Sequence, residues 1–219
     1  MLIRSLVSIA GSALLAGCSI VGVRSGTEQP KYDIVERLDE GVEVRRYGER
    51  LAAEVTVSRG GRGANENSAF GALAGYIFGK NQTRTEIAMT SPVETGLGAQ
   101  KKQSEKIAMT APVETTSAGK TMTMRFFLPS SYTVENAPKP LNPDVNIVAV
   151  SSETIATLRF SGLRSSANVE THKAELLSRL SDSAWSPKGA PVAYFYDPPW
   201  TVPTLRRNEI AVPVEKREG

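Results

Sequence analysis

A nine-residue stretch, IAMTSPVET at residues 87–95, returns as IAMTAPVET at residues 107–115 with eight of its nine positions identical. Each copy alternates between two sets of positions. One set holds Ile, Met, Ser (Ala in the second copy) and Val, and the other holds Ala, Thr, Pro and Glu. This period of two is typical of a half-buried β-strand. Pro92 and Pro112 cannot donate a hydrogen bond to a neighbouring strand, so we expect each copy to be an edge strand or to end near its proline. The repeat is therefore either a duplicated hairpin that only builds core or a strand face that walls a ligand pocket through its methionines.

Alternating patterns on both sides of the repeat predict further strands. They cover residues 32–37, 42–47, 51–58, 121–128, 145–150 and 154–160, with last strands around 193–195 and 210–214. Residues 145–150 and 154–160 are predicted to form a strand pair around Ser151-Ser152, and Gly41 and Gly48 sit where turns belong.

Two segments have the periodicity of amphipathic helices. Their apolar stripes are Phe70, Leu73, Ala74 and Ile77 in residues 66–78, and Val169, Leu176, Leu177 and Leu180 in residues 168–182. Gly79 is placed to stop the first helix. Gly71, Gly75 and Gly79 recur every four residues, which fits either tight packing on the sheet or a flat ligand lying against this helix.

The order strand-strand-helix-strand-strand occurs twice, over residues 42–128 and 145–214. This internal symmetry predicts an α+β protein built as a pseudo-symmetric curved antiparallel β-sheet or barrel flanked by two α-helices. A ligand pocket in such a fold forms between a helix and the sheet or at the barrel mouth.

Residues 1–18 have the features of a secretory signal. Arg4 precedes an apolar run that is too short to span a bilayer, which needs about 20 residues, and small residues follow it. Leu15-Ala16-Gly17-Cys18 resembles a bacterial lipobox, which implies cleavage before Cys18 and lipidation of its thiol. Ser19 after the cysteine favours the outer membrane, with the protein facing the periplasm. Residues 19–30 then read as a flexible tether and residues 31–215 as one domain.

Composition narrows the functional classes. The net charge of +3 in 219 residues gives no electrostatic argument for nucleic acid. One Cys and one His exclude an internal disulfide and a Cys/His zinc cluster. The single His also leaves few groups for acid–base chemistry, and no Gly-X-Ser-X-Gly motif occurs. We therefore expect a protein that is not an enzyme.

Three motifs together resemble the SOUL haem-binding protein family. They are residues 76–81 (YIFGKN) leading to 106–113 (KIAMTAPV), residues 196–200 (YDPPW), and residues 206–210 (RRNEI). The resemblance covers about residues 32–214 and implies a pseudo-symmetric β-barrel with two helices. It also implies binding of haem or a related tetrapyrrole, without catalysis, in an apolar groove beside the first helix. The extra copy at 87–95 and the lipoprotein signal depart from the family pattern. Of the two copies, we expect the second to supply the strand that the family shares.

A haem site needs an apolar slot, cations for two propionates and often an axial ligand. The candidate residues are Phe70, Leu73, Ala74, Ile77 and Met109 for the slot, Lys80, Arg206 and Arg207 for the propionates, and Tyr196 from the motif. Each of them can equally be plain core, a solvated charge or, for the arginines, a structural ion pair with Glu209.

His172 is the candidate iron ligand because it is the only imidazole in the chain. It lies about 80° from the centre of the second helix's apolar stripe, a position more typical of a partly exposed His without a special role. Two alternatives stay open, namely another flat amphipathic ligand in the same groove, and Cu(I) bound by thioethers. The candidate thioethers are those of Met89, Met109, Met122 and Met124, for which core filling is the competing interpretation. The expected partners are haem and, through the lipid anchor, a membrane; we expect a monomer.

Overall fold

The structure is a computed structural model that describes residues 27–38, 41–58, 66–82, 111–118, 121–198 and 200–218. The first copy of the repeat, most of the second copy with Met109, and the lipobox with Cys18 lie outside the described residues. Neither of the described α-helices combines the length and apolar character that crossing a bilayer requires.

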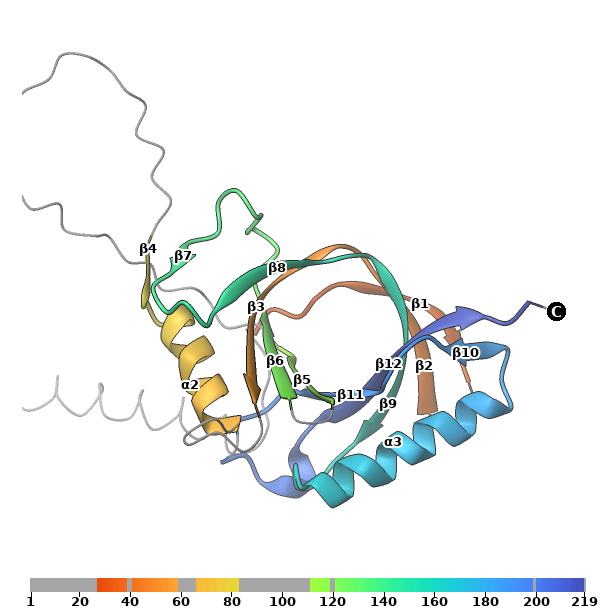
Figure 1. Cartoon of the computed structure of the whole chain (residues 1–219). Coiled ribbons are helices and arrows are strands. Elements are labelled where there is room, and N and C mark those ends of the chain that lie inside the picture. Colours follow the sequence, from red (N-terminus) through yellow and green to blue (C-terminus); the bar gives the residue numbers. More distant parts are fainter. Residues whose placement is uncertain are drawn as a thin grey trace, which may run out of the picture.

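A ten-stranded antiparallel sheet curls into a half-barrel, and two helices lie outside the curl (Figure 1). Its strands are β1 (Tyr32–Arg37), β2 (Val42–Tyr47), β3 (Arg50–Ser58), β5 (Val113–Ala118), β6 (Thr121–Phe127), β8 (Asn146–Val150), β9 (Glu153–Phe160), β10 (Trp185–Pro187), β11 (Val192–Phe195) and β12 (Asn208–Lys216). The remaining elements are the strand pair β4 (Asn81–Gln82) and β7 (Lys139–Pro140), the helices α2 (Glu66–Ile77) and α3 (Ser166–Ser181), and the 3-10 helix η2 (Pro203–Leu205). The predicted α+β fold is confirmed, and β4, β7 and β10 were not predicted.

The sheet order confirms the predicted pseudo-symmetry. Along the sheet the strands run β2-β9-β12-β11-β5-β6-β3-β8. This order is the same from either end once β2 is matched with β8, β3 with β9, β5 with β11 and β6 with β12. The pseudo-twofold axis therefore falls between β11 and β5, which pair antiparallel.

The predicted strand pair around Ser151-Ser152 is wrong, although both strands exist. β8 pairs with β3, whereas β9 pairs with β2 and β12. The first strand of each half thus joins the second strand of the other half. Ser151-Ser152 lacks the Gly or Asn that a tight two-residue hairpin needs at its positive-φ positions, so the turn does not bind the strands together.

The second copy of the repeat enters the sheet at Val113, directly after Pro112. β5 begins after the proline and pairs with β11 and β6, so the expected edge strand, or strand ending near Pro112, is wrong for this copy; a proline is tolerated just before a strand begins. Val113 packs against the core under α2, as the alternation predicted. Glu114 on the opposite face is also buried, at 6% exposure, because that face looks into the half-barrel.

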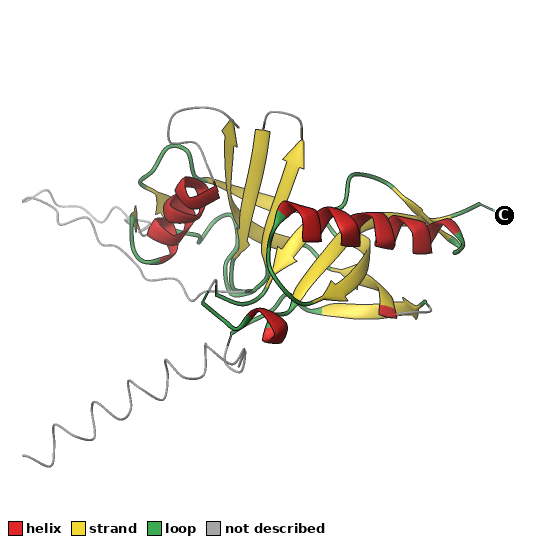
Figure 2. Ribbon diagram, turned by 90° about the horizontal axis from the view of Figure 1, so that it is seen from below, coloured by secondary structure: helices red, strands yellow, loops and turns green. Residues whose placement is uncertain are grey.

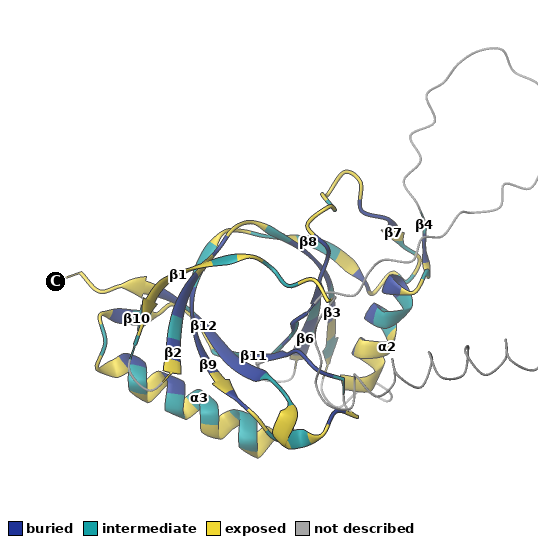
Figure 3. Ribbon diagram, turned by 180° about the vertical axis from the view of Figure 1, so that it is seen from behind, coloured by how far each residue is buried: buried dark blue, intermediate teal, exposed yellow. Residues whose placement is uncertain are grey.

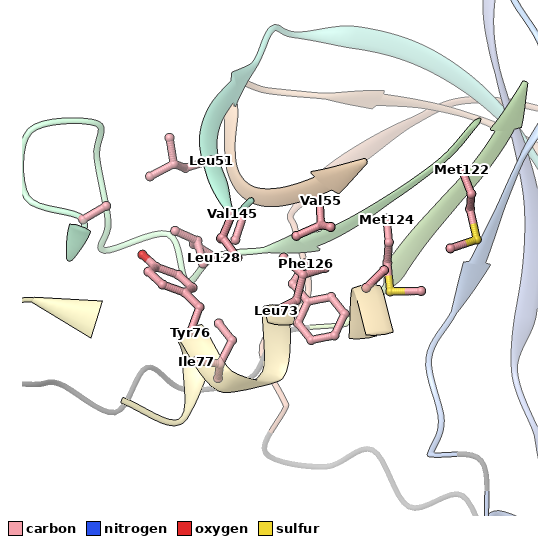
Figure 4. Packing of buried hydrophobic residues seen from close by; sticks show 13 residues of the cluster. Leu51, Val55, Leu73, Tyr76, Ile77, Met122, Met124, Phe126, Leu128 and Val145 are labelled. Atoms are coloured by element: carbon pink, nitrogen blue, oxygen red, sulfur yellow. The ribbon is translucent and has the colours of Figure 1, made fainter. Parts of the chain in front are cut away.

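Each helix covers its own apolar core on the outer face of the sheet. Under α2, Leu73 and Ile77 pack with Phe126 and other residues of β3 and β6 (Figure 4). Under α3, Leu176 and Leu180 pack with strands β2, β9, β11 and β12. Figure 3 shows the alternation of buried and exposed residues along α3 that this one-sided packing requires. Gly79 ends α2 with a φ of 107°, a conformation that favours glycine, as predicted.

The inner face of the half-barrel carries buried ion pairs among aromatic and aliphatic side chains. Glu209 of β12 has a fully buried side chain. Its carboxylate accepts hydrogen bonds from Arg45 Nη1 at 2.9 Å, Arg207 Nη2 at 2.7 Å and the Tyr196 hydroxyl at 2.6 Å. Burial acts to raise the pKa of Glu209, but the hydrogen bonds and positive charges of Arg45 and Arg207 prevail and lower it.

A second group of ion pairs lies on the same face of the sheet. Arg125 bonds Glu114 at 2.9 Å and Glu54 at 2.5 Å. Burial raises the pKa of Glu114 in spite of the nearby Arg125. Arg50 pairs with Glu153, and its guanidinium lies over the rings of Tyr47 and Phe127, at 4.4 and 4.7 Å from their centroids. The two groups place paired charges inside the curl, where Glu54, Glu114 and Arg125 also border a cavity of about 350 Å³.

Leu176→Ala should lower the free energy of unfolding by about 2–5 kcal/mol, because it opens a cavity in a core where Leu176 is fully buried. Leu177→Ala removes the same atoms from the neighbouring position, which is 38% exposed, and should change stability by only about 0.5 kcal/mol. Urea denaturation of both variants measures the difference. Equal losses would contradict the orientation of α3.

Glu209→Gln should cost about 3–5 kcal/mol at neutral pH, because it leaves two guanidinium groups without their buried carboxylate. Glu114→Gln should cost less, since burial already disfavours the ionised form of that side chain. Because the folded protein lowers the pKa of Glu209, its contribution exists above the ordinary value of 4.5 and is lost as the pH falls through the folded value. Urea denaturation across a pH series should therefore show wild type and Glu209→Gln converging in acid; a constant gap would refute this role.

Candidate functional site

A groove lies between the two helices on the outer face of the sheet, beside the pseudo-twofold axis. It forms a cavity of about 340 Å³. We call it the interhelical groove; it is lined by Thr115, Met122, Ala193 and Phe195 from the sheet, by Ser166, Val169, Glu170 and Lys173 from α3, by Glu66 from α2, and by Arg164. The α3 residues are spaced i, i+3, i+4 and i+7, so they form one face of that helix.

Arg164 is the central charged group of the groove. Its guanidinium lies over the Phe195 ring, 4.7 Å from the centroid, and donates a hydrogen bond to the Asp197 carbonyl. Its Nε is buried and has no hydrogen-bond partner among the described residues. Burial, together with the like charge of Arg206, lowers the pKa of Arg164. An anion that reached this N–H would satisfy a donor that the fold leaves open.

Two further polar groups of the groove bear on what it can bind. The hydroxyl of Thr115, on the floor, is buried and has no partner among the described residues. Lys173 Nζ pairs with Glu170 at 3.0 Å on the α3 side. Cations beside an apolar floor are what a flat apolar molecule with carboxylate substituents requires. The residues present therefore fit a tetrapyrrole with propionates, and equally another amphipathic anion.

The outer side of α2 continues this surface. Phe70 is 40% exposed and Phe78 is 61% exposed, with the half-buried Ala74 between them at helical spacing. Phe70 follows Glu66 by one turn on the same side of the helix and packs edge-to-face on Phe126, with ring centroids 5.3 Å apart. An exposed, largely apolar helix side beside the groove widens the area on which a flat ligand can lie.

The structure divides the predicted slot residues between this surface and the core. Phe70 and Ala74 lie on the outer side of α2. Leu73 and Ile77 point inward and are at most 1% exposed. Lys80 is exposed, and its aliphatic stem crosses Gly75, where an added Cβ would meet Lys80 Cδ at 3.1 Å. Met109 lies outside the described residues.

The other predicted residues lie away from α2. Tyr196 and Arg207 belong to the buried group around Glu209, and the Arg207 guanidinium lies 4.0 Å from the Tyr196 ring centroid. Arg206 turns to the other side and its Nε donates to the Thr201 carbonyl at 2.8 Å. The structural ion pair with Glu209, one of the competing interpretations, is thus the observed role of Arg207.

His172 faces the core under α3 rather than the groove. Its ring stacks on Phe160 with centroids 4.2 Å apart, and its Nδ1 lies 2.7 Å from the Asn168 carbonyl, to which it donates. The remaining ring nitrogen, Nε2, is 3.9 Å from Glu175. The predicted residues therefore occupy several places and do not meet in one pocket.

Sequence reasoning missed Arg164, Lys173 and Thr115. Arg164 stands in a break, between Gly162 with its φ of 103° and the helix cap Ser165. An arginine between a glycine and a helix cap can indicate an anion-binding position. From the sequence alone, however, Arg164 looks like an ordinary loop residue, because its contact with the Phe195 ring is seen only in the structure. The predicted symmetry, with both helices on one face of the sheet, would have pointed to a groove at the axis.

Comparison with known proteins gives a matching family model and solved structures of similar fold. The family model described as SOUL heme-binding protein matches residues 27–213. The crystal structure of the EcmrR C-terminal domain aligns with a TM-score of 0.52 and 13% identity over 85% of this chain and 99% of that chain. A hydrolase from Listeria innocua aligns with a TM-score of 0.50 and 16% identity over 83% of this chain and 94% of that chain.

At these identities the two solved structures share only the fold with this chain. The comparison with curated proteins gives no match. The family model, in contrast, spans both helices and all of the described sheet except residues 214–216 of β12. The chain therefore belongs to the SOUL haem-binding protein family.

Proposed function

We propose that this protein binds haem or a related tetrapyrrole in the interhelical groove, without catalysis, and serves to carry or buffer it in the cell envelope. The observation that carries this proposal is Arg164, whose buried Nε has no hydrogen-bond partner among the described residues while its guanidinium lies on the Phe195 ring. The family supplies the ligand class.

Different residues of the groove would bind different parts of the ligand. Met122, Ala193 and Phe195 offer the apolar floor for the macrocycle. Arg164 and Lys173 would bind the carboxylates, and Phe70 would extend the contact along α2. When bound, haem supplies an iron centre, but the ring of His172 is held against Phe160. Binding through apolar contact and ion pairing suits carriage better than redox work.

No observation favours the alternative of a Cu(I) site. Met122 and Met124 both belong to the core under α2, where a flexible thioether fills space. Met89 and Met109 lie outside the described residues. Another amphipathic anion remains the competing ligand for the groove, and a haem titration separates the two.

Haem should bind the purified protein saturably at micromolar concentration, seen as a shift of the Soret band. Arg164→Gln should weaken this binding about tenfold, the effect of losing one charge-assisted hydrogen bond of about 1.5 kcal/mol. Arg37→Gln is the matched control, because Arg37 is a surface arginine on β1 whose side chain is 67% exposed. The absence of a saturable shift would refute haem as the ligand and leave another amphipathic anion.

His172→Ala belongs to the same titration, as a control on the iron ligand. Because the ring packs on Phe160 outside the groove, the variant should keep the Soret spectrum of the wild type. A large spectral change in His172→Ala would instead assign the iron to α3 and overturn the groove as the site.

We also propose that the lipobox is used and that a lipid on Cys18 holds the protein at a membrane, with the outer membrane favoured by Ser19. Cys18→Ser should then move the protein from the membrane fraction to the soluble fraction of the periplasm, because the acyl chains provide the anchor. Fractionation followed by immunoblotting measures this. Cys18→Ser protein that stayed quantitatively in the membrane fraction would refute lipidation as the anchor.

A further inference from the structure

Four large apolar side chains are exposed close together at one end of the half-barrel. Trp200 is 65% exposed, Leu163 is 58%, Leu205 is 48% and Val202 is 39%. We call these four residues the apolar loop patch. Single exposed apolar residues are ordinary, but a group of large ones on a soluble domain marks an interaction surface.

The patch is built on a fixed frame. The Gly162 N–H donates to the Pro203 carbonyl at 2.9 Å, which ties the loop of Leu163 to η2. Within the second loop, the Leu205 N–H donates to the Val202 carbonyl at 2.9 Å. Figure 2 shows this loop and η2 projecting from the sheet. The patch is therefore presented outward rather than folded back on the domain.

The N-terminal end of the domain lies on the same side. Gln29 Oε1 accepts a hydrogen bond from Arg207 Nη1 at 3.2 Å, and Arg207 adjoins Arg206, which caps η2. Residues 19–26 separate Cys18 from Thr27, and an extended chain of that length reaches at most about 30 Å. A lipid on Cys18 would thus hold the end of the domain that carries the patch close to the bilayer.

We propose that the apolar loop patch inserts into the interfacial layer of the membrane that holds the lipid anchor. Tryptophan favours this layer, where its ring meets both apolar chains and polar headgroups. Arg206, half-buried beside η2, supplies a positive charge for anionic headgroups. The proposal rests on the lipid anchor proposed above but not on haem binding. Since Leu163 directly precedes Arg164, insertion would also place the interhelical groove at the membrane surface.

Tryptophan quenching by brominated lipid tests this proposal on the full-length lipidated protein. The protein is incorporated into vesicles of phosphatidylethanolamine and phosphatidylglycerol whose acyl chains are in part brominated. Trp200 emission should shift to the blue and be lost in large part, since bromine quenches only rings that enter the bilayer. Trp200→Phe isolates the second tryptophan, Trp185, which is 7% exposed and donates to Glu36 at 2.8 Å; its emission should be unaffected.

Leu205→Ser and Leu141→Ser form a matched pair, because the two leucines are 48% and 49% exposed and only Leu205 belongs to the patch. Leu205→Ser should reduce the quenching of Trp200, and Leu141→Ser should leave it unchanged. Vesicle flotation of the same samples reports the anchor separately. Unquenched Trp200 in protein that floats would overturn the insertion alone. Equal effects of the two serine variants would also overturn it, and failure to float would refute the anchor and the insertion together.

Discussion

The fold depends on one buried carboxylate, that of Glu209. It binds Arg45 of β2 and Arg207 before β12, so it joins the first strand of one half to the last strand of the other. Arg207 in turn holds Gln29, which fixes the N-terminal end of the domain. A charged carboxylate with no exposed surface is tolerable only because these partners satisfy it. The paired charges share the inside of the half-barrel with a buried cluster that includes Tyr47, Ile155 and Tyr194.

The two larger apolar clusters lie on the outer face of the sheet and have to be covered there. α2 and α3 cover most of that face, each over its own core. The pseudo-twofold axis passes between them, where β5 pairs with β11. The interhelical groove is the strip near this axis that neither helix covers. Its apolar floor is part of the outer apolar face of the sheet, and Arg164 Nε lies beside it without a hydrogen-bond partner among the described residues.

Periodicity and repeats were enough to predict the two helices, most strands and the symmetry, because these features depend on local patterns. Strand pairing was harder: Ser151-Ser152 suggested a hairpin, but β8 and β9 find their partners far along the chain. The site was harder still. Tyr196 and Arg207 belong to a conspicuous motif, yet they stabilise the inside of the half-barrel. Arg164 has no motif, because its significance comes from Phe195, thirty-one residues later in the sequence.

The motifs at residues 196–200 and 206–210, with the loop between them, combine three roles in one short segment. Tyr196 and Glu209 stabilise the interior, and the loop between them carries Trp200 and η2. The Asp197 carbonyl accepts a hydrogen bond from the Arg164 guanidinium. The Asp197 carboxylate accepts one from the Arg207 backbone N–H at 2.6 Å. A force on the exposed loop would therefore act on residues that hold Arg164 over the groove. Asp197 thus connects the loop that carries Trp200 with Arg164 beside the interhelical groove.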